Sequence, residues 1–324
     1  MLHRRLPAAL AAAFLVIASL AAGNVRAAYP DHPITIVVPA PAGGTADLVV
    51  RTITPKLSTA LGQAIIVENR PGASGIIASS DVAGAHPDGY TLLMIYTSHA
   101  INPWMKKNLP YDSAKAFSPV AFLGRVPLLM AVPADGPAKT AADLIALAKA
   151  KPGTLTFGSS ANGGASHLGG ELFSQLTGGK LTHVGYKGGA AAAMDLAAGR
   201  ISMLLDSQLV LMPYVQTGRV RIVGVASESP SAVFPNYPPV GKILPGFEAT
   251  AWFGIVAPAH TPSDVVDRLN AEINKRLEDP EIRKKLIERG FEPQAFTPAA
   301  WGAFLASETN RWGSLIRKAG LEAK

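Results

Sequence analysis

The chain has 324 residues, of which 48% are hydrophobic and 16% charged, with a formal net charge of +7, 31 glycines, 26 prolines and no cysteine. This composition excludes a disordered chain, a collagen and a disulfide scaffold, which need low hydrophobicity, a glycine at every third position and cysteine pairs, respectively. At roughly 100 to 200 residues per domain, the length predicts two globular units, each with its own hydrophobic core.

The first 27 residues have the composition of a secretory signal peptide. A basic start with Arg4 and Arg5 precedes an apolar stretch from Leu10 to Ala22, and Val25-Arg26-Ala27 supplies small residues at the offsets of a cleavage site. We therefore expect cleavage near Ala27 and a mature protein in a bacterial periplasm or outside the cell. A membrane anchor is the alternative, but the apolar run is shorter than the roughly 20 residues that cross a bilayer.

The charge of the mature chain is modest. Three of the 30 basic residues and none of the 23 acidic ones lie in the signal segment, so the remainder has a net charge of +4. These charges are spread along the chain without a basic run. We expect no nucleic-acid partner.

From Ile34 onward the sequence alternates β-branched runs, glycine-bearing turns and helical patterns. Repeated β-then-α units predict a parallel sheet covered by helices. The first set comprises strands at Ile34–Val38, Ala64–Val67 and Thr91–Tyr96, helices at Ala46–Leu61 and near Gly75–Ala83, and loops at Pro41–Thr45 and Thr97–His99.

A second set of such units follows Pro133 and extends to about Val225. It comprises helices at Ala141–Ala150 and about Ser166–Leu176, and strands at Thr154–Phe157, Leu181–Gly185 and Ile201–Leu205.

The last part of the chain has a different texture. Prolines between Pro230 and Pro245 exclude regular structure there, and an apolar run follows at Trp252–Ala257. Ser263 is predicted to cap an amphipathic helix that Asp279-Pro280 separates from the next one. The final helix is predicted at Pro298–Ala319.

The sequence lacks the signatures of catalysis. It has no nucleophile elbow, no Walker A loop, no dinucleotide-binding glycine motif and no H-E-x-x-H motif, and its seven histidines never stand at metal-ligand spacing. We expect no enzyme, no metal site and no cofactor. An exported hydrolase that uses Ser and His from the candidate loops is kept as the alternative from another class.

Two polar, glycine-bearing loops each follow a predicted strand and open a predicted helix, at Pro41–Asp47 and Gly158–His167. Free backbone N–H groups at a helix start carry a partial positive charge, and glycine lets a ligand approach them closely. Such a loop suits a carboxylate. Any α/β protein needs glycine-rich turns, but two such loops, one in each predicted unit, favour a binding role.

Single polar residues near these loops have a functional and a structural interpretation. Asp47 could bind a ligand, although an acid in a first helical turn, four residues from Arg51, is more typical of a structural role. Asp206 ends an apolar strand where α/β sheets point at ligand crevices. Lys187 could face an anion or solvent. His99 and His167 could donate hydrogen bonds or be packed.

Several blocks, in the right order, resemble the Bug family of solute receptors of tripartite tricarboxylate transporters. The resemblance covers essentially the whole mature chain. It is carried by Pro39–Asp47, Val67–Gly72, Pro87–Leu92, Leu109–Asp112, His183–Gly188 and Trp252–Gly254. Gly185, where the family usually has proline, and Leu204-Leu205-Asp206, in place of Met-Phe-Asp, depart from the pattern.

The resemblance implies a type II periplasmic binding protein of α/β class, with a sheet flanked by helices in each of two lobes. We place lobe 1 at residues 28–130 and 251–324, and lobe 2, inserted, at 131–250. Such a protein closes on a small organic acid and presents it to a membrane permease; a sensor-kinase ectodomain is an alternative partner. We expect a monomer. Because arginine is sparse in the loops, we expect backbone and hydroxyl donors, with bridging water.

The residues that this resemblance assigns to ligand binding come from both lobes. In lobe 1 they are Pro41, Ala42, Gly43, Gly44, Thr45, Asp47, Thr97, Ser98 and His99, and in lobe 2 Ser159, Ser160, Asn162, Gly164, Ala165, His167, Lys187, Gly188 and Asp206.

Overall fold

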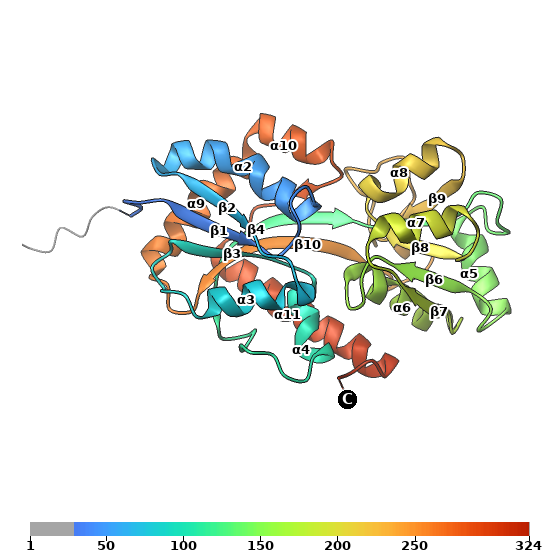
Figure 1. Ribbon diagram of the computed structural model, residues 1–324. Coiled ribbons are helices and arrows are strands. Elements are labelled where there is room, and N and C mark those ends of the chain that lie inside the picture. The colour runs from blue at the N-terminus through green and yellow to red at the C-terminus, as the bar shows by residue number, and fades with distance from the viewer. Residues whose placement is uncertain (1–28, 324) are drawn as a thin grey trace, which may run out of the picture.

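The computed structural model describes residues 29–323, so the predicted signal peptide lies outside the described residues. The fold is of the mixed α/β class, with two separate sheets, each flanked by helices, at the two ends of the molecule (Figure 1).

The first sheet has six strands in the order β11-β4-β10-β3-β1-β2. The prediction of a parallel sheet holds for β1, β2 and β3, whereas β10, at the apolar run for which no strand direction was predicted, runs antiparallel to β3 and β4. The reason is the chain path: β4 leads out to the second sheet and β10 returns from it. The strands are β1 (Ile34–Val38), β2 (Ile65–Asn69), β3 (Thr91–Tyr96), β4 (Phe117–Pro127), β10 (Thr250–Pro258) and β11 (Glu292–Pro293).

Helices cover both faces of this sheet, so its strands are buried on both sides. In β1, Ile36 packs into the core beneath α2, α9 and α10, whereas its neighbour Val37 packs into the core beneath α3, α4 and α11. The helices are α2 (Thr45–Leu61), α3 (Ile76–Ala83), α4 (Ser98–Met105), α9 (Ser263–Glu278), α10 (Pro280–Ile287) and α11 (Pro298–Ala319), with a 3₁₀ turn, η1, at Ala73–Gly75.

The second sheet has five strands in the order β7-β6-β8-β5-β9. Here β6 is parallel to β7 and β8, and β5 is antiparallel to β8 and β9. The strands are β5 (Leu129–Pro133), β6 (Thr156–Ser159), β7 (Thr182–Gly185), β8 (Met203–Asp206) and β9 (Val220–Val225), and the helices are α5 (Ala141–Ala150), α6 (Ala165–Thr177), α7 (Gly189–Ala197) and α8 (Gln208–Gln216). The proline-rich segment contains only a 3₁₀ turn, η2, at Val240–Lys242.

The chain passes between the sheets twice, at residue 128 and at residues 226–249. The two passages are hydrogen-bonded to each other where they meet, because the N–H of Ala226 donates to the carbonyl of Leu128 at 2.8 Å. The N–H of Ala249 donates in turn to the carbonyl of Ala226 at 2.9 Å. Connections of this kind, which join two bodies through few residues at the crossing point, are suitable positions for a hinge between them.

Several predicted boundaries differ from the structure, and three of these differences concern candidate site residues or a helix cap. Ser98 and His99 lie in the first turn of α4 and not in a loop. Ser159 belongs to β6, because its pairing with Gly185 extends the parallel ladder by one more residue. Pro262, and not Ser263, is the N-cap of α9, without a side-chain bond, since Ser263 already has a helical backbone.

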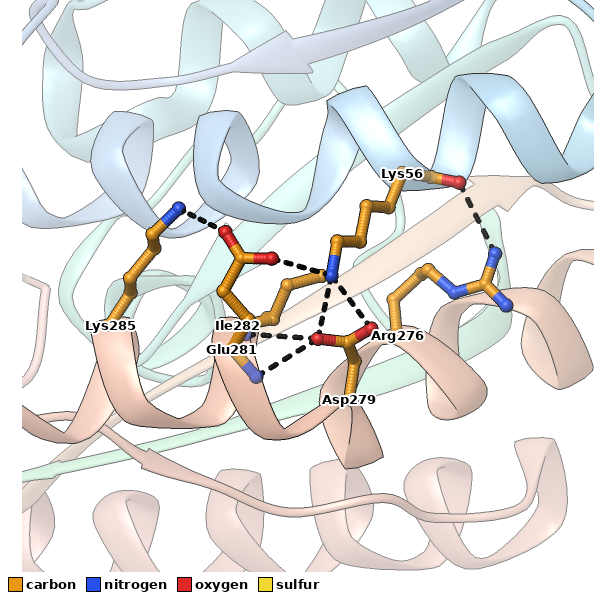
Figure 2. Close-up of polar contacts among 6 residues, drawn as sticks. All are labelled: Lys56, Arg276, Asp279, Glu281, Ile282 and Lys285. Atoms are coloured by element: carbon orange, nitrogen blue, oxygen red, sulfur yellow. Dashed lines mark hydrogen bonds and ion pairs between the residues drawn. The ribbon is translucent and has the colours of Figure 1, made fainter.

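The start of α10 is capped as its sequence, Asp279-Pro280, suggests. The carboxylate of Asp279 accepts hydrogen bonds from the N–H groups of Glu281 and Ile282, and Pro280 is the first residue of α10. Lys56 on α2 contacts both acids, at 2.9 Å from Asp279 and 2.8 Å from Glu281 (Figure 2). This network fixes the junction of α9 and α10 against α2, the helix whose other end reaches the site.

Candidate functional site

A hollow of about 240 Å³ lies between the two sheets and takes its wall from both. Most wall residues follow the carboxyl ends of β1, β3, β6 and β8, which is the edge where α/β sheets bind ligands. The wall consists of Thr45, Tyr96, Thr97, Ser98, Val126, Leu128, Ser160, Ala161, Gly164, Ala165, Ser166, Asp206, Ser207, Ala251 and Phe253. We call this hollow the cleft.

Four helices begin at this wall: α2 and α4 from the first sheet, and α6 and α8 from the second. Their N-cap residues are Gly44, Thr97, Gly164 and Ser207, and none of these caps makes a side-chain hydrogen bond to its helix. The N–H groups of the first turns are therefore not consumed by side-chain caps. Four partial positive charges converge on one small space, which suits an anion.

The wall contains several hydroxyl groups but only one side chain of the charged residue types. Asp206 is the single acid, and no lysine, arginine or histidine lines the cleft. Three hydroxyls are already engaged, because Ser98 and Ser166 donate to the carbonyls of Ser74 and Leu205, at 2.9 and 2.5 Å, and Thr97 accepts from the N–H of Trp252 at 3.1 Å. The wall therefore offers a ligand backbone dipoles and uncharged donors rather than cationic side chains.

The first glycine loop leads into α2 and contributes Thr45 to the wall, and its residues Pro41, Ala42 and Gly43 are exposed. Asp47 is buried and faces away from the cleft, since its carboxylate accepts hydrogen bonds from the Gly43 N–H at 2.9 Å, Arg51 Nε at 2.8 Å and Asn69 Nδ2 at 2.9 Å. Burial opposes ionisation, but these bonds outweigh it and lower the pKa of Asp47. Of the predicted residues 41–47, Thr45 alone is part of the wall; Pro41, Ala42, Gly43, Gly44 and Asp47 form the turn that presents it.

The second glycine loop is held from behind by two histidines. Ser159 Oγ lies 2.7 Å from His183 Nε2, and the rings of His183 and His167 stack with centroids 3.9 Å apart. The N–H of Gly163 donates to His167 Nδ1 at 3.1 Å, so the ring proton of a neutral His167 is on Nε2, which faces Glu171 at 3.6 Å. Burial and the neighbouring His167 lower the pKa of His183 to about 4, against the opposing charge of Glu171.

This cluster bears on the hydrolase alternative. Ser159 is fully buried, so its hydroxyl cannot reach a substrate despite the short contact with His183. Ser159 and His167 therefore support the turn, while Ser160, Gly164 and Ala165 reach the wall.

The structure gives a steric reason for glycine at position 185, where the family usually has proline. A Cβ atom there would stand 2.5 Å from Asn162 Oδ1, so a proline or any larger residue would displace the Asn162 side chain. The glycine at position 185 thus leaves space for the side chain of Asn162. Asn162 itself lies outside the wall.

The remaining predicted residues, His99, Lys187 and Gly188, are not part of the wall. His99 is buried between Tyr111 and Phe117, and burial lowers its pKa to about 4. Lys187 is exposed to solvent. Gly188 has a φ of 122° and donates its N–H to the carbonyl of Ser160 at 2.9 Å, which anchors the turn.

Six wall residues lie outside the predicted ligand loops: Tyr96, Val126, Leu128, Ser207, Ala251 and Phe253. Two more, Ala161 and Ser166, lie in the predicted loop Gly158–His167 but were not among its assigned binding residues. Ser207 directly follows Asp206, and Tyr96 ends a predicted strand, so their positions in the sequence could have predicted that both reach the cleft. Leu128 lies in a passage between the sheets, and Val126 and Ala251 lie on β4 and β10 beside the passages; none of the three had a signal in the sequence.

Three larger hollows lie elsewhere, and one of them, of about 320 Å³ between α6 and α11, is lined by Arg311 and Lys318. A second, of about 410 Å³, is built from the second sheet and its helices, beside the carboxyl-terminal ends of α7 and α8 at Ala197 and Gly218. Carbonyl groups at helix ends carry partial negative charge, which disfavours an anion. The third, of about 440 Å³, lies along α11 in the first body. Within residues 29–323, no group of three or more acids and histidines is arranged to hold a metal.

Two α/β bodies joined by two passages, with a small cleft at the convergence of helix starts from both, define a two-lobed solute-binding protein. Residues 49–321 match the sequence model of the tripartite tricarboxylate transporter family receptor, and the chain belongs to this family. The members of this family to which the chain is similar are solute-binding receptors and not enzymes, so the resemblance found in the sequence is confirmed.

Individual relatives extend this result. Protein BugT of Bordetella pertussis is 32% identical over 314 residues, which cover 96% of this chain and 96% of that protein. The solved structure of Rpa4515 of R. palustris with adipate is 35% identical, with a TM-score of 0.81, over 91% of this chain and 100% of that one. MatC of Rhodopseudomonas palustris with bound malate is 29% identical, with a TM-score of 0.74, over 89% of this chain and 100% of that one.

In the part of the chain that the structure describes, no helix combines the length and the apolar character needed to span a membrane.

Proposed function

We propose that this protein binds a small organic carboxylate in the cleft and delivers it to a membrane permease of the tripartite tricarboxylate type. The observation that carries the proposal is the convergence of four helix starts, without side-chain caps and from both sheets, on a wall with no cationic side chain. Adipate and malate, bound by two similar proteins, are acids of the size that the cleft suits. The family description supports the permease as partner.

The proposed binding residues act in two layers. Thr45, Thr97, Ser98, Ser160, Gly164, Ala165 and Asp206 would contact the ligand from the wall. Pro41, Ala42, Gly43, Gly44, Asp47, His99, Ser159, Asn162, His167, Lys187 and Gly188 would shape the turns and packing behind it. Binding would require no bond chemistry, and the two passages near residues 128 and 226 would bend as lobe 1 (28–130 and 251–324) and lobe 2 (131–250) close.

A periplasmic location accords with a solved relative, the periplasmic binding protein BugD, which is 30% identical to this chain. We propose export by the amino-terminal signal peptide with cleavage near Ala27. Mass spectrometry of exported protein should place the first residue within one or two positions of Ala28. An exported form that retains Met1 would refute this.

The ligand class can be tested by thermal unfolding. A carboxylate that binds only the folded protein, added at about 100 times its dissociation constant, should stabilise it by roughly 2.7 kcal/mol. Adipate, malate and succinate should be screened beside the corresponding diamides, which keep the carbon skeleton and lose the charge. At least one acid should raise the melting temperature while its diamide does not. Stabilisation by diamides or sugars alone would refute the anion class.

A further inference from the structure

Asp206 is the only ionisable acid in a cleft built for anions. It ends β8 with 7% of its surface exposed. Its Oδ1 accepts the N–H of Ser207 at 2.7 Å, whereas Oδ2 is buried and has no hydrogen-bond partner. The start of α7 crowds the same oxygen, because a Cβ on Gly189 would stand 2.9 Å from it.

No charged group is available to neutralise Asp206. The ionisable side chains on the second-sheet elements packed around it are committed to other partners or to solvent: His167 with Glu171 on α6, Asp195 with Arg200 and Tyr186 beside α7, His183 on β7 with Ser159, and Lys187 in solvent. Across the cleft, Asp47 pairs with Arg51, Arg125 on β4 with Glu248, and Arg289 donates to Thr52 Oγ1 at 3.0 Å. Strands β5 and β10 and helix α8 carry no charged residue. Burial raises the pKa of Asp206 to about 6, against the N–H of Ser207 and the neighbouring hydroxyl groups of Ser207 and Ser160.

We propose that Asp206 takes up one proton from solvent when the carboxylate binds, and that its Oδ2–H then donates a hydrogen bond to the ligand. This inference rests on the proposed function. In this proposal the unpartnered Oδ2 of Asp206, once protonated, donates a hydrogen bond to the ligand. An acidic side chain can then contribute to the binding of an anion. A carboxylic acid held neutral in an apolar site is able to do this.

The alternative, an ionised Asp206 beside the ligand, is the more costly state. Two like charges about 5 Å apart, at an effective dielectric constant of about 20, weaken binding by roughly two hundred-fold. With a pKa of about 6, one Asp206 in roughly ten is protonated at pH 7, so the requirement for a proton weakens binding only about ten-fold. Binding with proton uptake therefore costs less affinity than binding beside an ionised Asp206. It also adds a hydrogen bond that ionised Asp206 could not donate.

Calorimetry in buffers of different ionisation enthalpy measures this proton directly. Adipate and malate should be titrated into the mature protein at pH 7.5 in phosphate, HEPES and Tris, and then between pH 7 and 8.5. Both acids are fully ionised there, so they supply no proton. We expect uptake of about one proton per ligand and an apparent affinity that falls about ten-fold per pH unit.

Two variants test whether Asp206 is the group that takes up the proton. Asp206→Asn should bind without proton uptake and with an affinity that does not change over this pH range, because its amide donates without titrating. Asp267→Asn, at an exposed position on α9 outside the cleft, should keep both the uptake and the pH slope. Binding by the unmodified protein without proton uptake would overturn the inference, as would equal uptake in Asp206→Asn. If no acid in the screen binds between pH 5.5 and 8.5, the proposed function itself fails, and the inference falls with it.

Discussion

Replacing Gly164 with valine is expected to weaken carboxylate binding by roughly ten-fold to over a hundred-fold, with little effect on the stability of the ligand-free protein. Gly164 is the N-cap of α6, has an extended backbone with φ of −96°, and lies on the cleft wall. Its Cβ would meet only Ala161, at 3.5 Å from the carbonyl oxygen and 3.9 Å from Cβ, so the fold has room for it. The added side chain would stand between the N–H groups of α6 and the ligand.

The expected size is that of one lost charge-assisted hydrogen bond, about 1.5 to 3 kcal/mol. Calorimetric affinity and ligand-free melting should be measured on the same samples. Gly84→Val is the matched control, since Gly84 has φ of −92°, no neighbour closer than 3.8 Å to its Cβ, and an exposed position outside the cleft. An unchanged affinity in Gly164→Val, or a melting loss as large as the binding loss, would remove α6 from the proposed site.

Replacing Asp47 with alanine is expected to lower the free energy of unfolding by about 2 to 4 kcal/mol. The substitution removes one buried carboxylate and leaves the Gly43 N–H and the Asn69 amide without their acceptor. The pair with Arg51 adds little, because 47% of the Arg51 side chain is exposed. Binding should weaken as well, because the turn that presents Thr45 loses its anchor.

The effect of Asp47 should depend on pH with a defined sign. Its pKa is lower in the folded protein than in the unfolded chain, so ionised Asp47 stabilises the fold above the ordinary carboxyl range near 4. That contribution is lost as the pH falls through the lowered pKa. Urea unfolding at pH 7 and pH 3 should therefore show a smaller difference between the two proteins at the lower pH. A difference below about 0.5 kcal/mol at pH 7 would contradict this role.

Much of the fold could be predicted because local pattern and tertiary structure agree. The helix predicted at Pro298–Ala319 has those bounds in the structure, and the predicted strand at Thr91–Tyr96 is β3. Strand direction could not be predicted for β10, because its neighbours depend on the chain returning from the second sheet and not on any local feature. The predicted capping by Ser263 failed for a local reason, since Pro262 already supplies the extended backbone before α9.

The candidate site was predictable where a loop follows a strand and opens a helix. Thr45, Gly164 and Ala165 were predicted on that basis and lie in the wall. Sequence spacing could not tell which side of a turn faces the cleft, so His99 and Asp47 were grouped with residues that the fold separates from them. Val126 and Ala251 reach the wall only because β4 and β10 connect the two sheets, a contact between residues far apart in the chain.

The most direct measurement of the central claim is a crystal structure of the mature protein with adipate or malate. The account predicts one ligand in the cleft, with carboxylate oxygens about 2.7 to 3.1 Å from backbone N–H groups at helix starts of both lobes, near Thr45, Ser98 and Ala165. It also predicts a ligand oxygen within hydrogen-bonding distance of Asp206 Oδ2. A ligand bound instead in the hollow beside Ala197 and Gly218, or contacting the helix starts of one lobe alone in a closed protein, would contradict it.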